Sequence, residues 1–160
     1  MDFLFKYITK QYEAVRGTRR VLFDYCGTIA PTDFLYENSS FGRGGSIRSL
    51  LVHIVNTYEF WIAKNALHQA IQFTTYDSQT SIAQIVDLFN SVDVFRYQFI
   101  ALFQISDVNE INYTLNGVEK ITSGLTLFTH VITHEFHHKG QVLSMSRHLG
   151  YTPVDTDIIR

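Results

Sequence analysis

The sequence predicts an all-α protein, a four-helix bundle with a small β-hairpin before the last helix. The only prolines, Pro31 and Pro153, leave the body of the chain without helix breakers. Long segments between polar connections carry apolar residues at spacings of three and four, the pattern of amphipathic helices. Asn116-Gly117 lies between alternating apolar and polar residues and is a strong signal for a hairpin turn.

In the first half of the chain, two helices are expected around a long connection. The first helix runs from Phe3 to about Cys26 and is followed by a glycine- and serine-rich loop, residues 27–45. Ser46 is a suitable N-cap for a second helix that runs from Ile47 to about Gln69.

The second half of the chain is expected to contain the other two helices and the hairpin. Residues 73–79 form a polar connection, and Thr80 or Ser81 caps a third helix that ends near residue 104. The hairpin covers residues 111–121, and Ser123 begins a fourth helix that ends near residue 149. Four long helices in one domain, residues 1–160, predict an antiparallel bundle.

The composition is that of a globular protein and gives no sign of nucleic-acid or membrane binding. Hydrophobic residues make up 46% and charged residues 18% of the chain, and the net charge is −2. The two small basic clusters, Arg16 with Arg19 and Arg20, and Arg43 with Arg48, are interpreted as a solvated face. No apolar run approaches the ~20 residues of a membrane span. Cys26 is the only cysteine, which excludes an internal disulfide, fits a reducing compartment and leads us to expect a cytoplasmic protein.

A cluster of histidines marks the predicted fourth helix. In a helix, side chains four residues apart lie one above the other, so two imidazoles at this spacing can converge on one ion. Two such pairs exist, His130 with His134 and His134 with His138. The second pair belongs to an apolar seam with a 3.5-residue period, the face that a bundle helix turns inward. The seam consists of Leu127, Val131, His134, His138, Val142, Met145 and Leu149.

A third ligand is expected from the second helix. His53 has apolar neighbours, Leu50 and Ile54, whereas His68 lies at the polar end of that helix and is the alternative. Three imidazoles suit zinc, nickel, iron or copper better than calcium or magnesium, and zinc or nickel is expected here. Three protein ligands leave a coordination position open for water or substrate. The alternative is that these are hydrogen-bonded core histidines that bind no ion.

No catalytic acid or base can be assigned from the sequence. The string HEFHH at His134-Glu135 is shared with metalloproteases only locally, and no further ligand helix or sheet accompanies it, so peptidase activity is not favoured. Glu59 and Glu135 are both expected to be solvated. Tyr58 and Tyr36 are weak candidates for hydrogen-bond donors in the site.

The segment SIRSLLVHIVNTYEFWI, followed by HVITHEFHHKGQVLSMSRHLGYTP, resembles the DinB-like (damage-inducible, YfiT-related) superfamily. The matching pattern is HxxxHxxxHRGQ, then LG and Pro, and the resemblance spans most of the chain. Its residues are His130, His134, His138, Lys139, Gly140 and Gln141, then Leu149, Gly150 and Pro153. Lys139 stands where the family pattern has an arginine. A lysine keeps the positive charge but lacks the planar guanidinium that makes bidentate contacts. Gly140 is interpreted as a residue that permits close helix packing.

The resemblance implies a bundle with up-down-down-up topology, often a homodimer, and a metal on His53, His134 and His138. Relatives include thiol S-transferases that use bacillithiol and a mycothiol-dependent maleylpyruvate isomerase. The resemblance therefore implies a metal-dependent thiol S-transferase that uses a low-molecular-weight thiol and a small electrophile. A metal-dependent hydrolase, or a non-catalytic metal- or ligand-binding stress-response protein, is the alternative.

Overall fold

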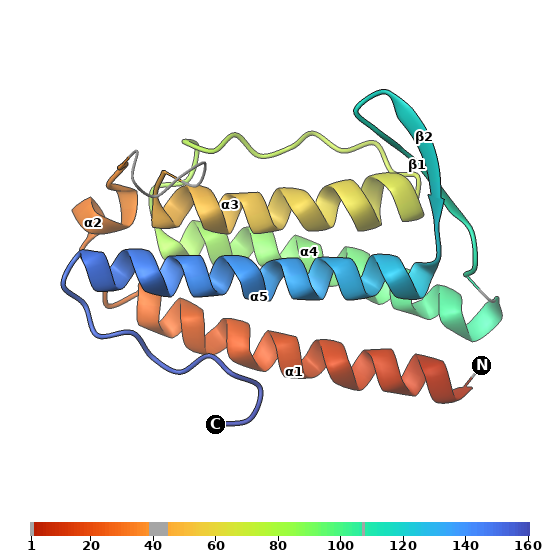
Figure 1. Cartoon of the computed structure of the whole chain (residues 1–160), viewed down its shortest axis with the longest axis horizontal. Coiled ribbons are helices and arrows are strands. Elements are labelled where there is room, and N and C mark those ends of the chain that lie inside the picture. The colour runs from red at the N-terminus through yellow and green to blue at the C-terminus, as the bar shows by residue number, and fades with distance from the viewer. Residues whose placement is uncertain (1, 39–44, 107) are drawn as a thin grey trace.

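The computed structural model describes residues 2–38, 45–106 and 108–160. Four long helical segments lie side by side along the molecule (Figure 1). They are α1 (Asp2–Cys26), α3 (Ile47–Tyr58) with its π-helical continuation η2 (Glu59–Ala66), α4 (Ile82–Ile105) and α5 (Gly124–His148). Two strands, β1 (Ile111–Leu115) and β2 (Val118–Thr122), form an antiparallel hairpin before α5. The predicted class, a helical bundle with a hairpin before the last helix, is confirmed.

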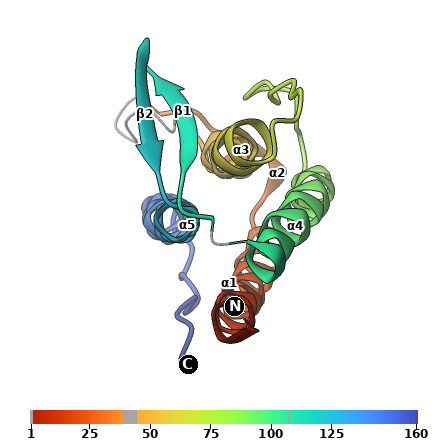
Figure 2. The same ribbon diagram turned by 90° about the vertical axis from the view of Figure 1, so that its right-hand side faces the viewer.

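The helices follow the up-down-down-up order that the resemblance implied. Figure 1 shows α1 and α5 running in one direction and α3 and α4 in the other. Because α3 and α4 are parallel, residues 67–81 must return along the length of the bundle before α4 begins. Helix α3 packs against α4 and α5, and α1 packs against the same two helices. Figure 2 shows the four helices end on, with the hairpin beside α5.

Short polar side chains begin the helices where the sequence predicted. Ser46 accepts a hydrogen bond from the backbone N–H of Ser49 and caps α3, and Ser123 does the same for α5 through Thr126. Ser81, rather than Thr80, caps α4, and its capping box is completed by the Gln84 side chain. These bonds satisfy N–H groups that have no partner within the helix.

The connection after α1 contains a short helix that the sequence analysis took for loop. Pro31 begins α2 (Pro31–Leu35), where its fixed φ and missing N–H suit the first turn of a helix. Tyr151, in the segment after α5, donates a hydrogen bond to Asp33 over 2.7 Å and accepts one from the Ala30 N–H. The end of the chain thereby holds α2 in place. The part of the predicted loop at residues 39–44 lies outside the described residues.

The apolar core lies between the four helices and is rich in aromatic rings. Ile8 and Tyr12 from α1, Leu51 and Val55 from α3, and Phe99 from α4 are all fully buried in this core. From α5, the core receives Leu127, Phe128, Val131, Val142 and Met145. Cys26 is buried in the same core. Within the described residues, none of the helices combines the length and apolar character of a membrane span.

Three glycines differ in whether the fold requires the absence of a side chain at their position. Gly117 has a φ of +77° and follows Asn116 at +53°, so the hairpin closes through a tight turn that requires left-handed backbone. A Cβ on Gly124 would lie 2.8 Å from the Phe103 ring, so the start of α5 depends on the absence of a side chain. A Cβ on Gly140 would meet nothing within 4 Å, so the interpretation of Gly140 as a close-packing residue is wrong.

Candidate metal centre

The structure brings together the three histidines that the sequence analysis selected. His53 comes from the middle of α3, and His134 and His138 come from successive turns of α5, which packs against α3. Each offers one ring nitrogen, and these three atoms all lie within 4.8 Å of one another. The rings of His134 and His138 have their centroids 4.4 Å apart, and His53 lies 5.0 Å and 4.7 Å from them. The three side chains are therefore positioned to hold a metal ion.

Hydrogen bonds orient two of the three rings. The Nδ1 atom of His138 lies 2.6 Å from Oε1 of Gln141, one turn further along α5. Since an amide oxygen only accepts, His138 carries its proton on Nδ1 and directs its Nε2 lone pair toward His134, 3.2 Å away. His53 Nδ1 lies 3.3 Å from the hydroxyl of Tyr76. Partners of this kind fix the tautomer and direction of metal-binding histidines.

The environment keeps the imidazoles neutral, the form that binds metal. Burial and the neighbouring histidines lower the pKa of His134 from 6.5 to about 4. Burial also lowers the pKa of His53 and of His138. At neutral pH all three rings therefore present lone pairs without first losing a proton.

The donor set fits a borderline transition metal. Three neutral imidazoles are typical ligands of zinc, nickel, copper or iron, whereas calcium and magnesium prefer oxygen. The Nδ1 atom of His134 is buried and has no hydrogen-bond partner in the described structure. That nitrogen is not the one that faces His138, because the Nε2 atoms of the two rings lie 3.2 Å apart. The convergence of three neutral imidazole nitrogens within 4.8 Å of one another is what favours an ion over the alternative of ordinary core histidines.

A buried ionic network lies on the adjacent face of α5. Glu135 is fully buried, and its two carboxylate oxygens accept bonds of 3.0 Å and 2.7 Å from Arg19 of α1. Lys139, one turn further on, lies 3.1 Å from the same carboxylate, and Tyr58 of α3 donates to it over 2.7 Å. The Arg19 and Lys139 charges hold the pKa of Glu135 at about 2, although burial alone would raise it. The network thereby connects α1, α3 and α5.

This network corrects several interpretations of the sequence. Glu135 and Arg19 are buried partners, and Arg48 is buried as well, so none of the three belongs to a solvated face. Glu59 is also buried, and burial raises its pKa to about 6. Tyr58 serves the network rather than the histidines. Lys139 makes a single-point contact with each of its partners, as expected for an ammonium group in place of a planar guanidinium.

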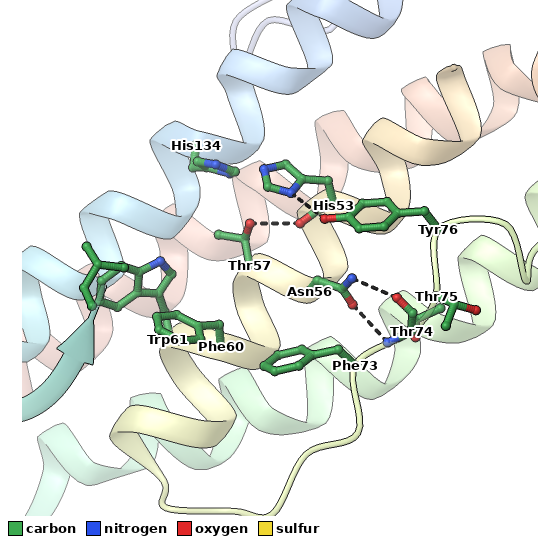
Figure 3. Close-up of a pocket in the computed structure, with 11 residues that line it drawn as sticks. His53, Asn56, Thr57, Phe60, Trp61, Phe73, Thr74, Thr75, Tyr76 and His134 are labelled. Carbon is green, nitrogen blue, oxygen red and sulfur yellow. Dashed lines mark hydrogen bonds between the residues drawn. The ribbon is translucent and has the colours of Figure 1, made fainter. Parts of the chain in front are cut away.

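A cavity of about 670 Å³ opens beside the histidines. Aromatic side chains and short polar side chains form most of its wall, and Figure 3 shows their arrangement. The lining consists of His53, Asn56, Thr57, Phe60, Trp61, Phe73, Thr74, Thr75, Tyr76, Leu115 and His134. Two of the candidate ligands therefore face the same space, which a small molecule can enter.

The returning segment, residues 67–81, supplies one side of this cavity. Asn56 of α3 fixes it by two hydrogen bonds to the backbone of Thr74, one to the carbonyl (2.9 Å) and one from the N–H (3.1 Å). Tyr76 then lies beside His53 and Phe73 faces Phe60. The sequence analysis treated residues 73–79 as a polar connection and missed their role. The pairing of Phe73 and Tyr76 in a polar segment was the available signal.

The other histidines lie outside the group of three. His130 packs its ring against Trp61 at 5.0 Å and lies 5.7 Å from His134, between the hairpin and the centre. His137 contacts His138 but points from the exposed face of α5. His68, the alternative third ligand, is in left-handed backbone after η2, with φ of +54°. Neither Tyr36 nor Glu59 lines the cavity.

Comparison with known protein families agrees with the helical-bundle fold. A family model described as the DinB family matches residues 4–160. No curated protein matches the chain significantly.

Proposed function

The chain belongs to the DinB family, and from this premise we propose that it is a metal-dependent thiol S-transferase acting on a small electrophile. His53, His134 and His138 would hold a divalent transition metal, with zinc or nickel expected. The observation that carries the proposal is that three imidazole nitrogens lie within 4.8 Å of one another at the wall of a cavity.

The donor set leaves room for a reactant. Among the described residues, the group that could hold an ion contains three side chains, fewer than the four ligands of a closed structural zinc site. A bound divalent ion would lower the pKa of a thiol or a water that entered the remaining position. The chain's own part is to present neutral imidazoles, to orient them through Gln141 and Tyr76, and to hold the electrophile in the cavity.

A low-molecular-weight thiol is the expected co-substrate, because the only cysteine of the chain is buried and its thiol is unreactive. Cys26 is 2% exposed, and burial raises the pKa of its thiol to about 12. The nucleophilic sulfur must therefore come from outside the chain. A cytoplasmic location, where such thiols are kept reduced, and a homodimer are parts of the same proposal. Light scattering on the purified protein tests the dimer.

A metal-dependent hydrolase and a non-catalytic binding protein are the alternatives. Water suits the open position as well as a thiol does. The second alternative is favoured by the cavity wall, because none of the described residues that line it is a carboxylate or a lysine that could act as a general base.

Metal analysis combined with a conjugation assay tests the proposal. The purified protein is assayed for bound metal and for transfer of several thiols to an electrophilic aryl substrate, and for hydrolysis of aryl esters. His134→Ala should abolish both metal binding and transfer, whereas His148→Ala, at the exposed end of α5, should retain both. Stoichiometric metal without turnover of any thiol or ester would identify a binding protein. Ester hydrolysis without thiol transfer would identify a hydrolase.

A further inference from the structure

We propose that the cavity beside the histidines binds an uncharged aromatic group, so that the electrophile is an aryl compound rather than a carboxylate or phosphate. The inference rests on the proposed function for the reaction. The binding step itself depends only on the cavity wall and can be measured separately.

The wall provides aromatic surface on several sides. Phe60 and Trp61 meet edge to face with centroids 5.0 Å apart, and Phe73 lies 6.5 Å from Phe60 at an interplanar angle of 34°. Tyr113 of the hairpin supports the other side of Trp61 at 4.9 Å. A planar ring that enters this space can stack on one face and meet edges on another, the arrangement that aromatic pairs prefer.

The described part of the wall offers no counter-ion for an anion. None of the described residues that line the cavity is an aspartate, glutamate, lysine or arginine. Lys64 is exposed on η2, and its ammonium lies 5.6 Å and 5.9 Å from the ring centroids of Phe60 and Phe73 without lining the space. A carboxylate that left water for this wall would lose hydration without gaining an ion pair.

Three polar side chains of the wall, those of Asn56, Thr57 and Tyr76, are already engaged within the protein. Asn56 uses both ends of its amide on Thr74. Thr57 donates its hydroxyl to the carbonyl of His53 over 2.8 Å, and the Tyr76 hydroxyl lies against His53 Nδ1. These three groups have little left to offer a charged ligand, which supports selection by shape and ring contact.

The local backbone explains why aromatic residues face this space. After Tyr58 the helix widens, and the N–H of Leu67 bonds to the carbonyl of Ile62, five residues earlier. Asn65 supports the widened turn by donating to the carbonyl of Phe60. Tyr58 therefore points into the core, while Phe60 and Trp61 reach the cavity. Such π-helical turns are frequent at functional sites.

The chain offers a direct probe of the cavity, because Trp61 is its only tryptophan. Quenching of tryptophan fluorescence by a nitroaromatic compound therefore reports a ligand at this wall. Two ligands with the same ring are compared, uncharged p-nitrobenzyl alcohol and anionic p-nitrobenzoate. Each is titrated into the protein as purified and into protein treated with a chelator, whose helical content is checked by circular dichroism.

The uncharged ligand should bind saturably in both preparations. In the chelated protein, where a carboxylate cannot use an ion, its affinity should exceed that of p-nitrobenzoate about tenfold or more. Phe73→Ala should weaken its binding about tenfold through the lost ring contact. Phe3→Ala, which removes a ring that is 82% exposed at the start of α1, is the matched control and should bind normally.

Equal affinities for the two ligands in the chelated protein, or unchanged binding by Phe73→Ala, would overturn the inference. Neither readout depends on bound metal or on turnover. If the protein has no transferase activity but still binds the uncharged ring through Phe73, the proposed function fails and the cavity assignment stands. If thiol transfer is observed but the uncharged ring does not bind through Phe73, the proposed function stands and the cavity assignment fails.

Discussion

The hydroxyl of Tyr58 donates a 2.7 Å hydrogen bond to Oε2 of Glu135, which joins α3 to α5 one residue away from a candidate metal ligand. Arg19 occupies the same oxygen from α1. A fully buried carboxylate thus has partners on three helices, including Lys139 on its own. The histidines stand on α3 and α5, so the network also fixes the two helices that carry the candidate metal centre relative to each other.

Replacing Glu135 by glutamine should destabilise the protein strongly. The amide keeps the shape of the side chain but leaves Lys139 as a buried cation without a countercharge among the described residues, and leaves Arg19 with Asp93 alone. Removal of one partner from a buried ion pair costs about 3–5 kcal/mol. Denaturant unfolding measures the loss, and Glu119→Gln on the exposed hairpin is the control. A decrease no larger than that of the control would contradict the role assigned to the network.

The Glu135 carboxylate should also make the stability of the protein depend on pH in the acid range. Its pKa in the folded protein is about 2, below the ordinary 4.5, so its contribution is complete above pH 4.5 and is lost as the pH falls toward about 2. The destabilisation by Glu135→Gln should therefore shrink in this window. Unfolding curves from pH 2.5 to pH 7 measure the difference, and a constant difference would refute the assignment.

Replacing Glu59 by glutamine should stabilise the protein at neutral pH, in contrast to the replacement of Glu135. Glu59 is buried at the start of η2, its Oε2 atom has no hydrogen-bond partner in the described structure, and its pKa is raised to about 6. The folded state prefers the protonated acid, so stability falls as the pH rises from about 4.5 through about 6. Glu59→Gln should gain about 1 kcal/mol at pH 7.5 and nothing at pH 4. Thermal unfolding at both pH values measures this, and a loss at pH 7.5 would show that the ionised carboxylate has a stabilising partner.

Replacing Asn56 by alanine should release one wall of the cavity. The substitution removes both hydrogen bonds to Thr74, at a cost of about 1–2 kcal/mol. Because residues 73–76 are otherwise exposed or partly exposed, their backbone should exchange hydrogen faster while α1 keeps its protection. Hydrogen-exchange mass spectrometry measures both, with Asn112→Ala on β1 as the control. Unchanged exchange at Thr74 would mean that other contacts hold the segment.

Cys26 should be inert in the folded protein. Its thiol is buried, and the pKa of about 12 keeps it protonated at any ordinary pH. A colorimetric thiol reagent at pH 8 should react only after denaturant is added, and Cys26→Ala should retain any thiol-transfer activity. Rapid stoichiometric reaction of the native protein, or loss of transfer in the variant, would make the chain's own sulfur a participant.

Features set by short-range chemistry were predictable from the sequence. Ser46 and Ser123 are caps because a hydroxyl lies three residues before an N–H that needs a partner. The turn at Asn116-Gly117 follows from the left-handed backbone that these residues tolerate. His134 and His138 share a face because the helix repeats every 3.6 residues. Their convergence with His53 also required that α3 pack against α5, which the family resemblance implied.

Features set by distant partners were not predictable. A glutamate four residues before a lysine is typical of an exposed helix face, so Glu135 and Lys139 were not expected in the core. Their burial depends on Arg19, which lies 116 residues from Glu135 in sequence. The cavity depends on Asn56 and Thr74, since α3 alone carries no signal that a returning segment will lie across it. The π-helical turn likewise left no recognisable pattern in a stretch that reads as ordinary helix.

That turn makes the cavity sensitive to chain length. A π-helical turn accommodates more residues than the α-helical turn that it replaces. Removing one amino acid between Tyr58 and Leu67 would let the segment rewind as regular α-helix, which would redistribute the side chains of this turn around the axis, Phe60 and Trp61 among them. Insertions and deletions, more than substitutions, are thus the changes by which relatives of this protein can gain or lose the aromatic wall in a single step.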